Sequence, residues 1–472
     1  METFLFLGLT SFVLCLFLTP LARELFRWLK IVDRPDQRRK IHCSPIPRAG
    51  GVAIVLSYFG SIALALMFLP QGSRLAIHHA SLFSWLIPAV AVIFVTGLLD
   101  DIFGLSPKTK LTLQFFAASL ACWGGVRIVT INDHEIAAWL GVPLTVLWLL
   151  ACCNAINLID GLDGLAAGVG LFAALTAITV AAIQGNVGLV LATVPLAGCL
   201  LAFLRYNFNP ASVFLGDSGS LTVGFLLGCF AVIWCQKIAT LTGLMAPLVS
   251  LLVPLLDVSL SVARRFVSNR PIFSPDRGHI HHRLLARGLP PKNVALLLYA
   301  VCGATGVLAV SLCLLEGAVG TLILLLALVL AAIAIWKLRF VEFEVLKQLI
   351  FTGHFRRSVE EGVRLLALQE DLLNAESVDD YWNLIIKVSE AEHIQSVKLK
   401  LSSATFQRTF HPALENEVWS MEFVLEPSLT LTIRGFYSDG EPQGSPAVRR
   451  VLQIASKVKL LNHQQAPSLS TV

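Results

Sequence analysis

The chain has 472 residues, of which 56% are hydrophobic and only 14% are charged, and its mean hydropathy is +0.73. These values exclude an ordinary soluble protein and indicate many membrane-spanning segments. The formal net charge of +5 is informative only once the charges are placed along the chain. The ten cysteines lie mostly in apolar stretches without metal-ligand spacing, so we interpret them as small core residues.

Apolar stretches long enough to cross a bilayer recur along most of the chain. A spanning helix needs about 20 mostly apolar residues. On that measure we predict eleven spans, at roughly residues 3–19, 50–69, 82–99, 109–124, 137–153, 164–183, 187–204, 219–235, 242–260, 294–314 and 318–336. The expected fold is therefore an all-α polytopic membrane domain over residues 1–336.

Basic residues are distributed unevenly between the two sets of loops. The loops that follow odd-numbered spans carry eighteen Lys or Arg residues, whereas the opposite loops carry three, Arg74, Arg127 and Lys237. Lys and Arg collect on the cytoplasmic side of membrane proteins. We therefore expect the N-terminus to face out and the C-terminus to face the cytoplasm.

Residues 337–472 have a different, soluble-like composition. A charge-rich helical stretch is followed by the alternating segments "SVKLKLS", "VWSMEFVLE" and "LTLTIRGFYS", and then by an amphipathic stretch. This pattern predicts a C-terminal cytoplasmic α+β domain. We interpret this domain as regulatory or as a docking site for a partner.

Two acidic motifs occur where predicted spans end on the basic side. In "GLLDDIFG" the adjacent Asp100 and Asp101 close the third span, where two like charges and the negative helix end are costly without a cation. In "NAINLIDGLDGLAAG" Asp160 and Asp163 are three residues apart and would share one face of a helical turn. The alternatives are a solvated helix end for the first motif and a helix cap by Asp163 for the second.

Two further acids follow. Asp217 in "FLGDSGS" precedes the eighth span, where we expect Asp217 or Ser218 to cap the helix without excluding contact with a ligand. Asp257 lies inside the apolar ninth span, so it is a functional candidate, with pairing to Arg264 or Arg265 as the structural alternative.

The last basic loop contains "DRGHIHHRLL", with Arg277, His279, His281 and His282. It has neither a Cys partner nor HExxH-type zinc spacing, so we interpret it as part of an anion site. Carboxylates for a hard divalent cation and basic groups for phosphates, gathered at one membrane face, predict phosphoryl transfer on a Mg²⁺–pyrophosphate complex.

Six motifs in order resemble the polyprenyl-phosphate N-acetylhexosamine-1-phosphate transferases of glycosyltransferase family 4. They are "DRPDQRRKIHCSPIPRAGG", "LLDD", "NAINLIDGLDGLAAG", "FLGDSGS", "PLLDVSLSVARR" and "HIHHRLL". The opening motif and "HIHH" are similar to the undecaprenyl-phosphate N-acetylglucosaminyl 1-phosphate transferase branch. The resemblance covers residues 1 to about 336 and does not extend to the tail.

The resemblance implies a Mg²⁺-dependent enzyme, with Mn²⁺ as the alternative ion, of the bacterial inner membrane. It would transfer a sugar 1-phosphate from a UDP-N-acetylhexosamine to undecaprenyl phosphate, releasing UMP, to begin a cell-envelope polysaccharide. The implied catalytic residues are Asp100, Asp101, Asp160, Asp163, His279, His281 and His282. The implied metal ligands are Asp217 and Asp163, and the implied substrate-binding residues are Asn154, Asn157, Gly161, Phe214 (stacked on uracil) and Arg277.

Several alternatives stay open at this level. A phospho-N-acetylmuramoyl-pentapeptide transferase is the nearest, and a membrane transporter fits the many spans and the intramembrane Asp257. The expected partners are the UDP-sugar, undecaprenyl phosphate and the lipid bilayer, with no nucleic acid. The identity of the sugar, the glycan that is begun, the role of the tail and the oligomeric state, with a homodimer among the alternatives, are not determined by the sequence.

Overall fold

The computed structural model divides into two compact units, Met1–Phe343 and Glu344–Val472. The structure describes residues 2–33, 45–69, 80–131, 134–235, 248–267, 279–315, 319–322, 325, 378–391, 394–401, 405–410, 418–426, 429–438 and 441–442. Arg277, the amphipathic stretch near the C-terminus and most of the eleventh predicted span lie outside these residues.

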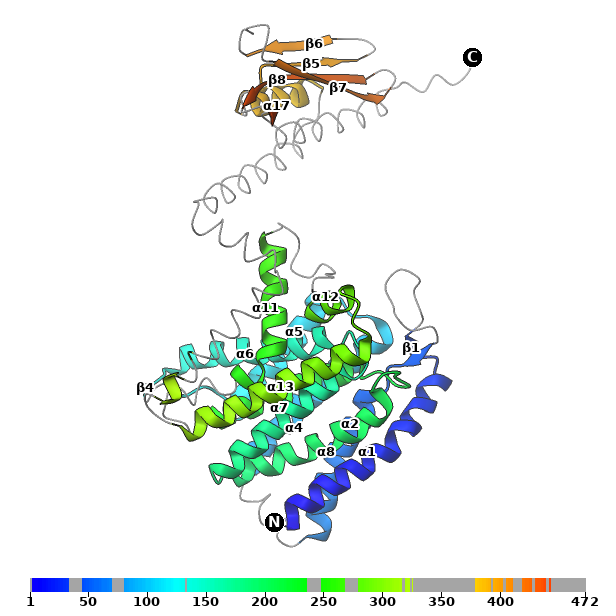
Figure 1. Cartoon of the computed structure of the whole chain (residues 1–472), viewed down its shortest axis with the longest axis vertical. Helices are drawn as coiled ribbons and strands as arrows, with labels where there is room; N and C mark the ends of the chain where they lie inside the picture. The colour runs from blue at the N-terminus through cyan, green and yellow to red at the C-terminus, as the bar shows by residue number, and fades with distance from the viewer. Residues whose placement is uncertain are drawn as a thin grey trace. The chain divides into compact units, whose positions relative to one another are not determined.

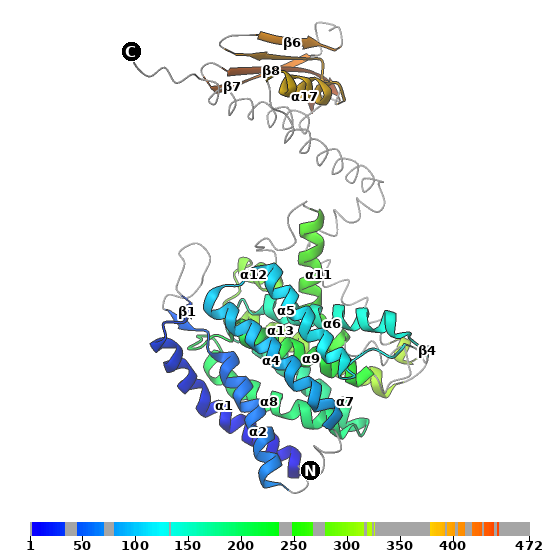
Figure 2. The same cartoon turned by 180° about the vertical axis from the view of Figure 1, so that it is seen from behind.

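The first unit is built from helices (Figures 1 and 2). In chain order they are α1 (Glu2–Trp28), α2 (Gly50–Phe68), α4 (Ala80–Phe103), α5 (Pro107–Trp123), α6 (Ala138–Ile159), α7 (Leu165–Ile183), α8 (Val187–Asn207), α9 (Gly216–Cys235), α11 (Leu252–Val267), α12 (Ile280–Ala286) and α13 (Pro291–Leu314). In the described part of the chain, eight of them are long and apolar enough to cross a membrane: α1, α2, α4, α6, α7, α8, α9 and α13.

The protein is therefore a mostly helical, polytopic membrane protein, as predicted. The fourth predicted span corresponds to α5, which has only 17 residues, and the ninth overlaps α11, whose apolar part is Leu252–Val262. The total of eleven spans stays a prediction.

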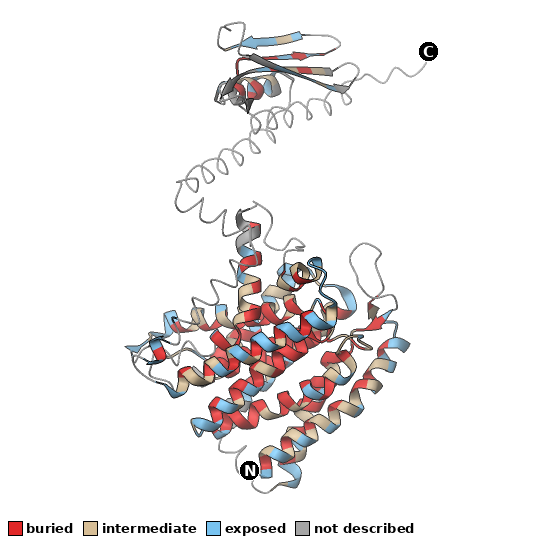
Figure 3. Cartoon of the chain, in the orientation of Figure 1, coloured by how far each residue is buried: buried red, intermediate tan, exposed pale blue. Residues whose placement is uncertain are grey.

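Helix α9 is the centre of the first unit. In its window Gly216–Ile233, 94% of the residues are buried, against 22% in the corresponding window of α1 (Figure 3). Its Gly224 and Gly228 are four residues apart and face Cys152 of α6, where a Cβ on Gly224 would lie 2.6 Å from the Cys152 carbonyl oxygen. Small residues at this spacing let membrane helices approach closely, so van der Waals contact holds them together.

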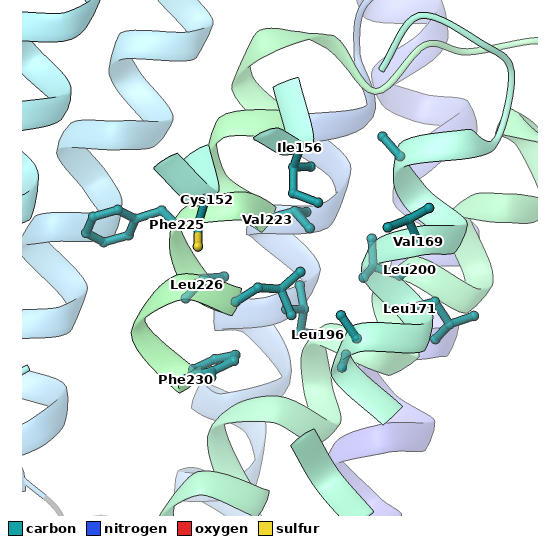
Figure 4. Close-up of a cluster of buried hydrophobic side chains, with 14 of the residues drawn as sticks. Cys152, Ile156, Val169, Leu171, Leu196, Leu200, Val223, Phe225, Leu226 and Phe230 are labelled. Atoms are coloured by element: carbon teal, nitrogen blue, oxygen red, sulfur yellow. The ribbon is translucent and has the colours of Figure 1, made fainter. Parts of the chain in front are cut away.

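Side chains from α6, α7, α8 and α9 meet in one core, drawn in Figure 4. It includes Ile156, Val169, Leu200 and Phe230, each at most 1% exposed. Seven cysteines are free and buried, and Cys313 is free and half-buried; the seven are Cys15, Cys122, Cys152, Cys153, Cys199, Cys229 and Cys302. The core is thus apolar and closely packed around the helix that carries Asp217.

Two short antiparallel pairs of strands join the helices: β1 (Val32–Asp33) with β2 (Ile46–Pro47), and β3 (Thr130–Ile131) with β4 (His134–Glu135). Arg48, just after β2, donates to Asp33 Oδ1 at 2.5 Å and so closes the first pair. In both views β1 and α12 lie at the same end of the first unit (Figures 1 and 2).

The second unit contains α17 (Val378–Ala391) and the strands β5 (Ser396–Lys400), β6 (Thr405–Thr409), β7 (Val418–Glu426), β8 (Leu429–Ser438) and β9 (Glu441–Pro442). The main strands pair antiparallel in the order β6-β5-β8-β7. Alternation along β5 buries Val397 and Leu399 and exposes Lys398 and Lys400. The strands β5, β7 and β8 lie where the sequence alternates.

Candidate active site

The turn between α4 and α5 folds the chain back on itself beside Asp100. Gly104 adopts a left-handed φ of +69° after α4, and Asp100 Oδ1 accepts the N–H of Leu105 at 2.6 Å. Ser106 then caps α5 by accepting the N–H of Thr109, and Pro107 fits the first helical position. This short connection places Lys110, in the first turn of α5, next to the acids that end α4.

Lys110 lies between two carboxylates from different helices. Its Nζ is 2.6 Å from Asp100 Oδ2 and also contacts Asp217 Oδ2. Asn157 of α6 donates to the other oxygen of Asp217 at 3.1 Å and to Ser220 at 2.9 Å. The ends of four helices therefore converge on one partly buried carboxylate, Asp217. Lys110 is one of the eighteen basic residues of the predicted cytoplasmic loops, and the Gly-x-Ser-Pro turn before it favours its return toward Asp100.

Asp101 has a different environment from Asp100. Its Oδ1 accepts the backbone N–H of Asp217 at 2.8 Å, and its Oδ2 accepts the N–H and the hydroxyl of Ser218 at 2.9 and 2.7 Å. The carboxylate is 9% exposed and faces the first turn of α9, where N–H groups lack helical partners. The capping acceptor for α9 is thus Asp101 of α4, whereas we had expected Asp217 or Ser218.

The first turn of α9 is held closely from two other helices. A Cβ on Gly51 of α2 would lie 2.3 Å from the Gly219 nitrogen, and one on Gly97 of α4 would lie 2.4 Å from the Asp217 carbonyl oxygen. In addition, Phe214 donates its N–H to Pro47 at 2.9 Å and accepts the N–H of Gly50 at 3.0 Å. These contacts bind the "PIPRAGG" segment to the "FLGDSG" segment.

The two acids of the "DGLDG" turn point to different partners. Asp163 Oδ2 accepts from Asn209 Nδ2 at 2.9 Å and from the N–H of Ala211 at 3.0 Å, so it fixes the loop between α8 and α9. The N-cap position of α7 is Gly164, without a side-chain cap, so Asp163 does not cap that helix. Asp160 follows α6, and its pKa is raised well above the ordinary value by burial and then by the charge of Asp217, against the opposing charge of Arg48.

Asn154 forms a hydrogen bond between α6 and α5. Its Nδ2 donates to Gln114 of α5 and to the Leu150 carbonyl, both at 2.8 Å. Asn157, one turn further along α6, is the amide that reaches the acidic group. Phe214 is half-buried.

The histidine motif is anchored to α11. Asp257 is 2% exposed, and its Oδ2 lies 2.9 Å from His279 Nδ1 while its Oδ1 accepts the N–H of Ile280 at 2.7 Å. The partner found for Asp257 is thus a histidine, where the alternative had named Arg264 or Arg265. His281 and His282 lie on α12, with ring centroids 4.3 Å apart.

His281 connects this motif to the "DGLDG" turn. A Cβ on Gly161 would lie 2.7 Å from His281 Nε2, so the glycine leaves room for the ring. His281 is 1% exposed, and neither ring nitrogen has a hydrogen-bond partner within the described residues. Burial, followed by the charge of His282, lowers its pKa to about 3, so the ring is neutral at physiological pH.

The carboxylates around Asp217 resemble a site for a divalent ion that substrate phosphates would complete. In the described ranges, no three His, Cys, Asp or Glu residues are close enough to form a metal cage. Asp100 and Asp217 nevertheless share one cation, the Lys110 ammonium, and carboxylate oxygens suit hard divalent ions. Mg²⁺ commonly binds through one or two carboxylates plus substrate phosphates, so these residues fit that kind of site rather than an all-protein cage.

Comparison with known proteins now identifies the family. The model of glycosyl transferase family 4 matches residues 82–235, which include the whole acidic group. A probable undecaprenyl-phosphate N-acetylglucosaminyl 1-phosphate transferase of Bacillus subtilis is 33% identical over 299 residues, covering 62% of this chain and 80% of that protein. The chain belongs to glycosyl transferase family 4. This confirms the family predicted from the six motifs.

Two other relatives agree with this assignment. A decaprenyl-phosphate N-acetylglucosaminephosphotransferase of Mycobacterium leprae is 35% identical over 327 residues, covering 63% of this chain and 80% of that protein. An undecaprenyl-phosphate alpha-N-acetylglucosaminyl 1-phosphate transferase of Escherichia coli K12 is 26% identical over 306 residues, covering 61% and 79%. The names of these relatives agree with the N-acetylglucosaminyl branch of the family.

Proposed function

We propose that the chain transfers N-acetylglucosamine 1-phosphate from UDP-N-acetylglucosamine to undecaprenyl phosphate, releases UMP, and so begins a cell-envelope polysaccharide. The names of its relatives combine a polyprenyl phosphate with N-acetylglucosaminyl phosphate transfer. The observation that carries the proposal is the pairing of Asp100 and Asp217 around Lys110 at converging helix ends. The two carboxylates can bind the metal ion of a metal–pyrophosphate complex, and the Lys110 ammonium can balance negative charge on its phosphates.

In this reaction an oxygen of the lipid phosphate forms a bond to the β-phosphorus of the UDP-sugar. The bond between that phosphorus and the bridging oxygen breaks, and its electron pair leaves with UMP. Asp100 is the carboxylate that we assign to the lipid phosphate, to orient it or to accept its proton. Asp101 is less suited, because three hydrogen bonds to the start of α9 already use its oxygens.

Asp217, with Asp100, is the group that we propose to hold Mg²⁺ or Mn²⁺. When bound, the ion would neutralise negative charge on the phosphates. Asn157 orients Asp217 by donating to Oδ1, which leaves Oδ2 directed at Lys110. When the ion is bound, the Lys110 ammonium would turn from the two carboxylates toward the substrate phosphates. We assign Asp163 to positioning, because Asn209 and Ala211 both donate to its Oδ2.

We assign His281, His282, Arg277 and Phe214 to the nucleotide sugar. His281 carries two ring nitrogens without described partners, beside Gly161 and the turn that holds Asp160. A neutral imidazole can donate to one phosphate or sugar oxygen. Phe214 would stack on uracil.

We further propose that the site faces the cytoplasm of a bacterial inner membrane, where UDP-sugars are made. The asymmetry of the basic loops supports this orientation. The tail would lie on the same side, as a regulatory or docking domain of α+β type.

A transporter is the competing function of another class. Substrate sites of transporters lie near the bilayer midplane, whereas these acids lie at helix ends and turns. Together with the family assignment, this favours the enzyme. The muramoyl-pentapeptide reaction remains the alternative within the same chemistry.

A direct assay separates these functions. The purified full chain would be incubated with undecaprenyl phosphate, Mg²⁺ and UDP-N-acetylglucosamine labelled either in the uridine or in the sugar. We expect labelled UMP from the first donor and labelled lipid from the second, and neither from Asp217→Asn. A parallel reaction would use UDP-N-acetylmuramoyl-pentapeptide as the donor. Product formed only in that reaction would favour the muramoyl-pentapeptide alternative, and no product in either reaction would overturn the proposal.

A further inference from the structure

Asp257 is an acid in the apolar part of α11, Leu252–Val262, and both of its oxygens bond to one short segment 22 and 23 residues further along the chain. Burying a carboxylate at 2% exposure costs free energy unless it is fully hydrogen-bonded. Oδ2 meets this need through the ring of His279, and Oδ1 through the N–H of Ile280. The start of α12 is therefore fixed by α11.

The orientation of His279 follows from the chemistry of its partner. A carboxylate oxygen accepts hydrogen bonds, so we assign Nδ1 of His279 as the donor to Asp257 Oδ2. Histidines held in this way keep one tautomer and one ring orientation. Ser261 Oγ lies 3.4 Å from the same nitrogen, at the limit of a hydrogen bond, and adds little to this contact.

The effect of Asp257 extends to the "DGLDG" turn through α12. His281 lies two residues after His279, and the two rings are stacked with centroids 5.7 Å apart. The His281 ring in turn lies against Gly161. A change in the start of α12 would thus displace His281 from the turn that carries Asp160.

On these grounds we propose that Asp257 is a positioning residue, which acts through His279 and α12 to hold His281 against the "DGLDG" turn. The inference rests on the proposed function for its kinetic consequence, but not for its structural one. Asp257 itself touches neither substrate nor metal in this proposal.

Asp257→Asn is the sharpest substitution, because asparagine has nearly the same shape but only one acceptor oxygen. In the same orientation its NH2 group takes the place of the oxygen that faces His279 or Ile280, so one of them loses its acceptor or His279 changes tautomer. We expect kcat to fall by about 10- to 100-fold, the range found when a carboxylate that orients a functional histidine is removed. The KM for UDP-N-acetylglucosamine should rise as well, because the displaced His281 is assigned to the nucleotide sugar.

The matched control is Ser259→Ala on the same helix, whose exposed hydroxyl donates to the Leu255 carbonyl of its own helix. It should leave kcat unchanged. A double-mutant cycle with His279→Ala tests the route of the effect. If Asp257 acts through His279, Asp257→Asn should cost less than about threefold in the His279→Ala background.

Hydrogen–deuterium exchange of the purified full chain gives a readout that needs no substrate. In Asp257→Asn, exchange should increase in the peptide that covers residues 279–287 and stay unchanged in peptides from α6 and α9. Wild-type kcat or unchanged exchange in α12 would overturn the proposal, as would equal losses in both backgrounds of the cycle. If the wild-type chain releases no UMP, the proposed function fails, and the exchange experiment still decides the role of Asp257.

Discussion

Asp101 of α4 accepts the backbone N–H of Asp217 of α9 at 2.8 Å, across 116 residues of sequence. The adjacent Asp100 instead reaches the Asp217 side chain through Lys110. Asp101 thus binds the backbone of Asp217, whereas Asp100 shares the Lys110 ammonium with the Asp217 carboxylate. This difference predicts different consequences for otherwise identical substitutions.

Asp101→Asn should destabilise the protein, whereas Asp100→Asn should mainly inactivate it. The first substitution leaves one acceptor oxygen for three donors at the start of α9, and losing a helix cap costs about 1 kcal/mol. The second substitution removes one of the two negative charges that contact Lys110. Thermal unfolding in detergent and turnover of the folded fraction would be measured for both variants. Equal thermal midpoints for the two would contradict the capping role of Asp101.

Asp160→Asn should raise the thermal midpoint at neutral pH. The pKa of Asp160 is raised in the folded state by burial and by Asp217, so above its ordinary pKa the ionised group lowers the stability of the fold. This cost diminishes as the pH falls toward the ordinary value, and the gain from Asn should diminish with it. Midpoints would be compared at pH 7.5 and pH 5, with Glu135→Gln on the exposed strand β4 as the control.

Removal of divalent ions should abolish turnover. If Asp217 holds the ion, chelation with EDTA should stop UMP release, and Mg²⁺ or Mn²⁺ should restore it. Asp217→Asn should lower kcat by about 10²-fold or more while the protein still purifies as a folded species. Full turnover after rigorous chelation would exclude the metal role.

The orientation in the membrane can be tested at the two ends of α5. A cysteine in place of Arg127, after the helix, should react with an impermeant maleimide in intact cells, whereas one in place of Lys108, at its start, should not. The buried native cysteines of the described residues limit the background. Reversed labelling would put the acidic group on the side without UDP-sugars.

The tail should be dispensable for the chemistry. Residues after Phe343 belong to a separate compact unit, and the groups that we assign to the reaction all precede it. Truncation after residue 343 should leave a folded enzyme with kcat within about threefold of the full chain, because none of the assigned groups is removed. A monodisperse but inactive truncation would instead indicate that the tail completes the site as a lid.

The motifs predicted the family, but they do not determine which contacts each residue within a motif makes. Asp100 and Asp101 look equivalent in "LLDD", and only the approach of α9 distinguishes them. The resemblance implies a metal-binding role for Asp163, and the structure adds contacts that its motif does not show, because Asp163 Oδ2 accepts from Asn209 and Ala211 in the loop between α8 and α9. Helical periodicity fixes which residues share a face and leaves open which helices meet there.

The narrow contacts around the first turn of α9 have a consequence for natural variation. At Gly51 and Gly97 any side chain would collide with backbone atoms of that turn, which cannot move aside as a flexible side chain can. In a saturation library selected for growth, both positions should therefore reject even alanine, while exposed positions on the membrane helices, such as Leu5 of α1, should accept most apolar residues. Inactivating alleles would then concentrate at two residues that carry no functional group at all.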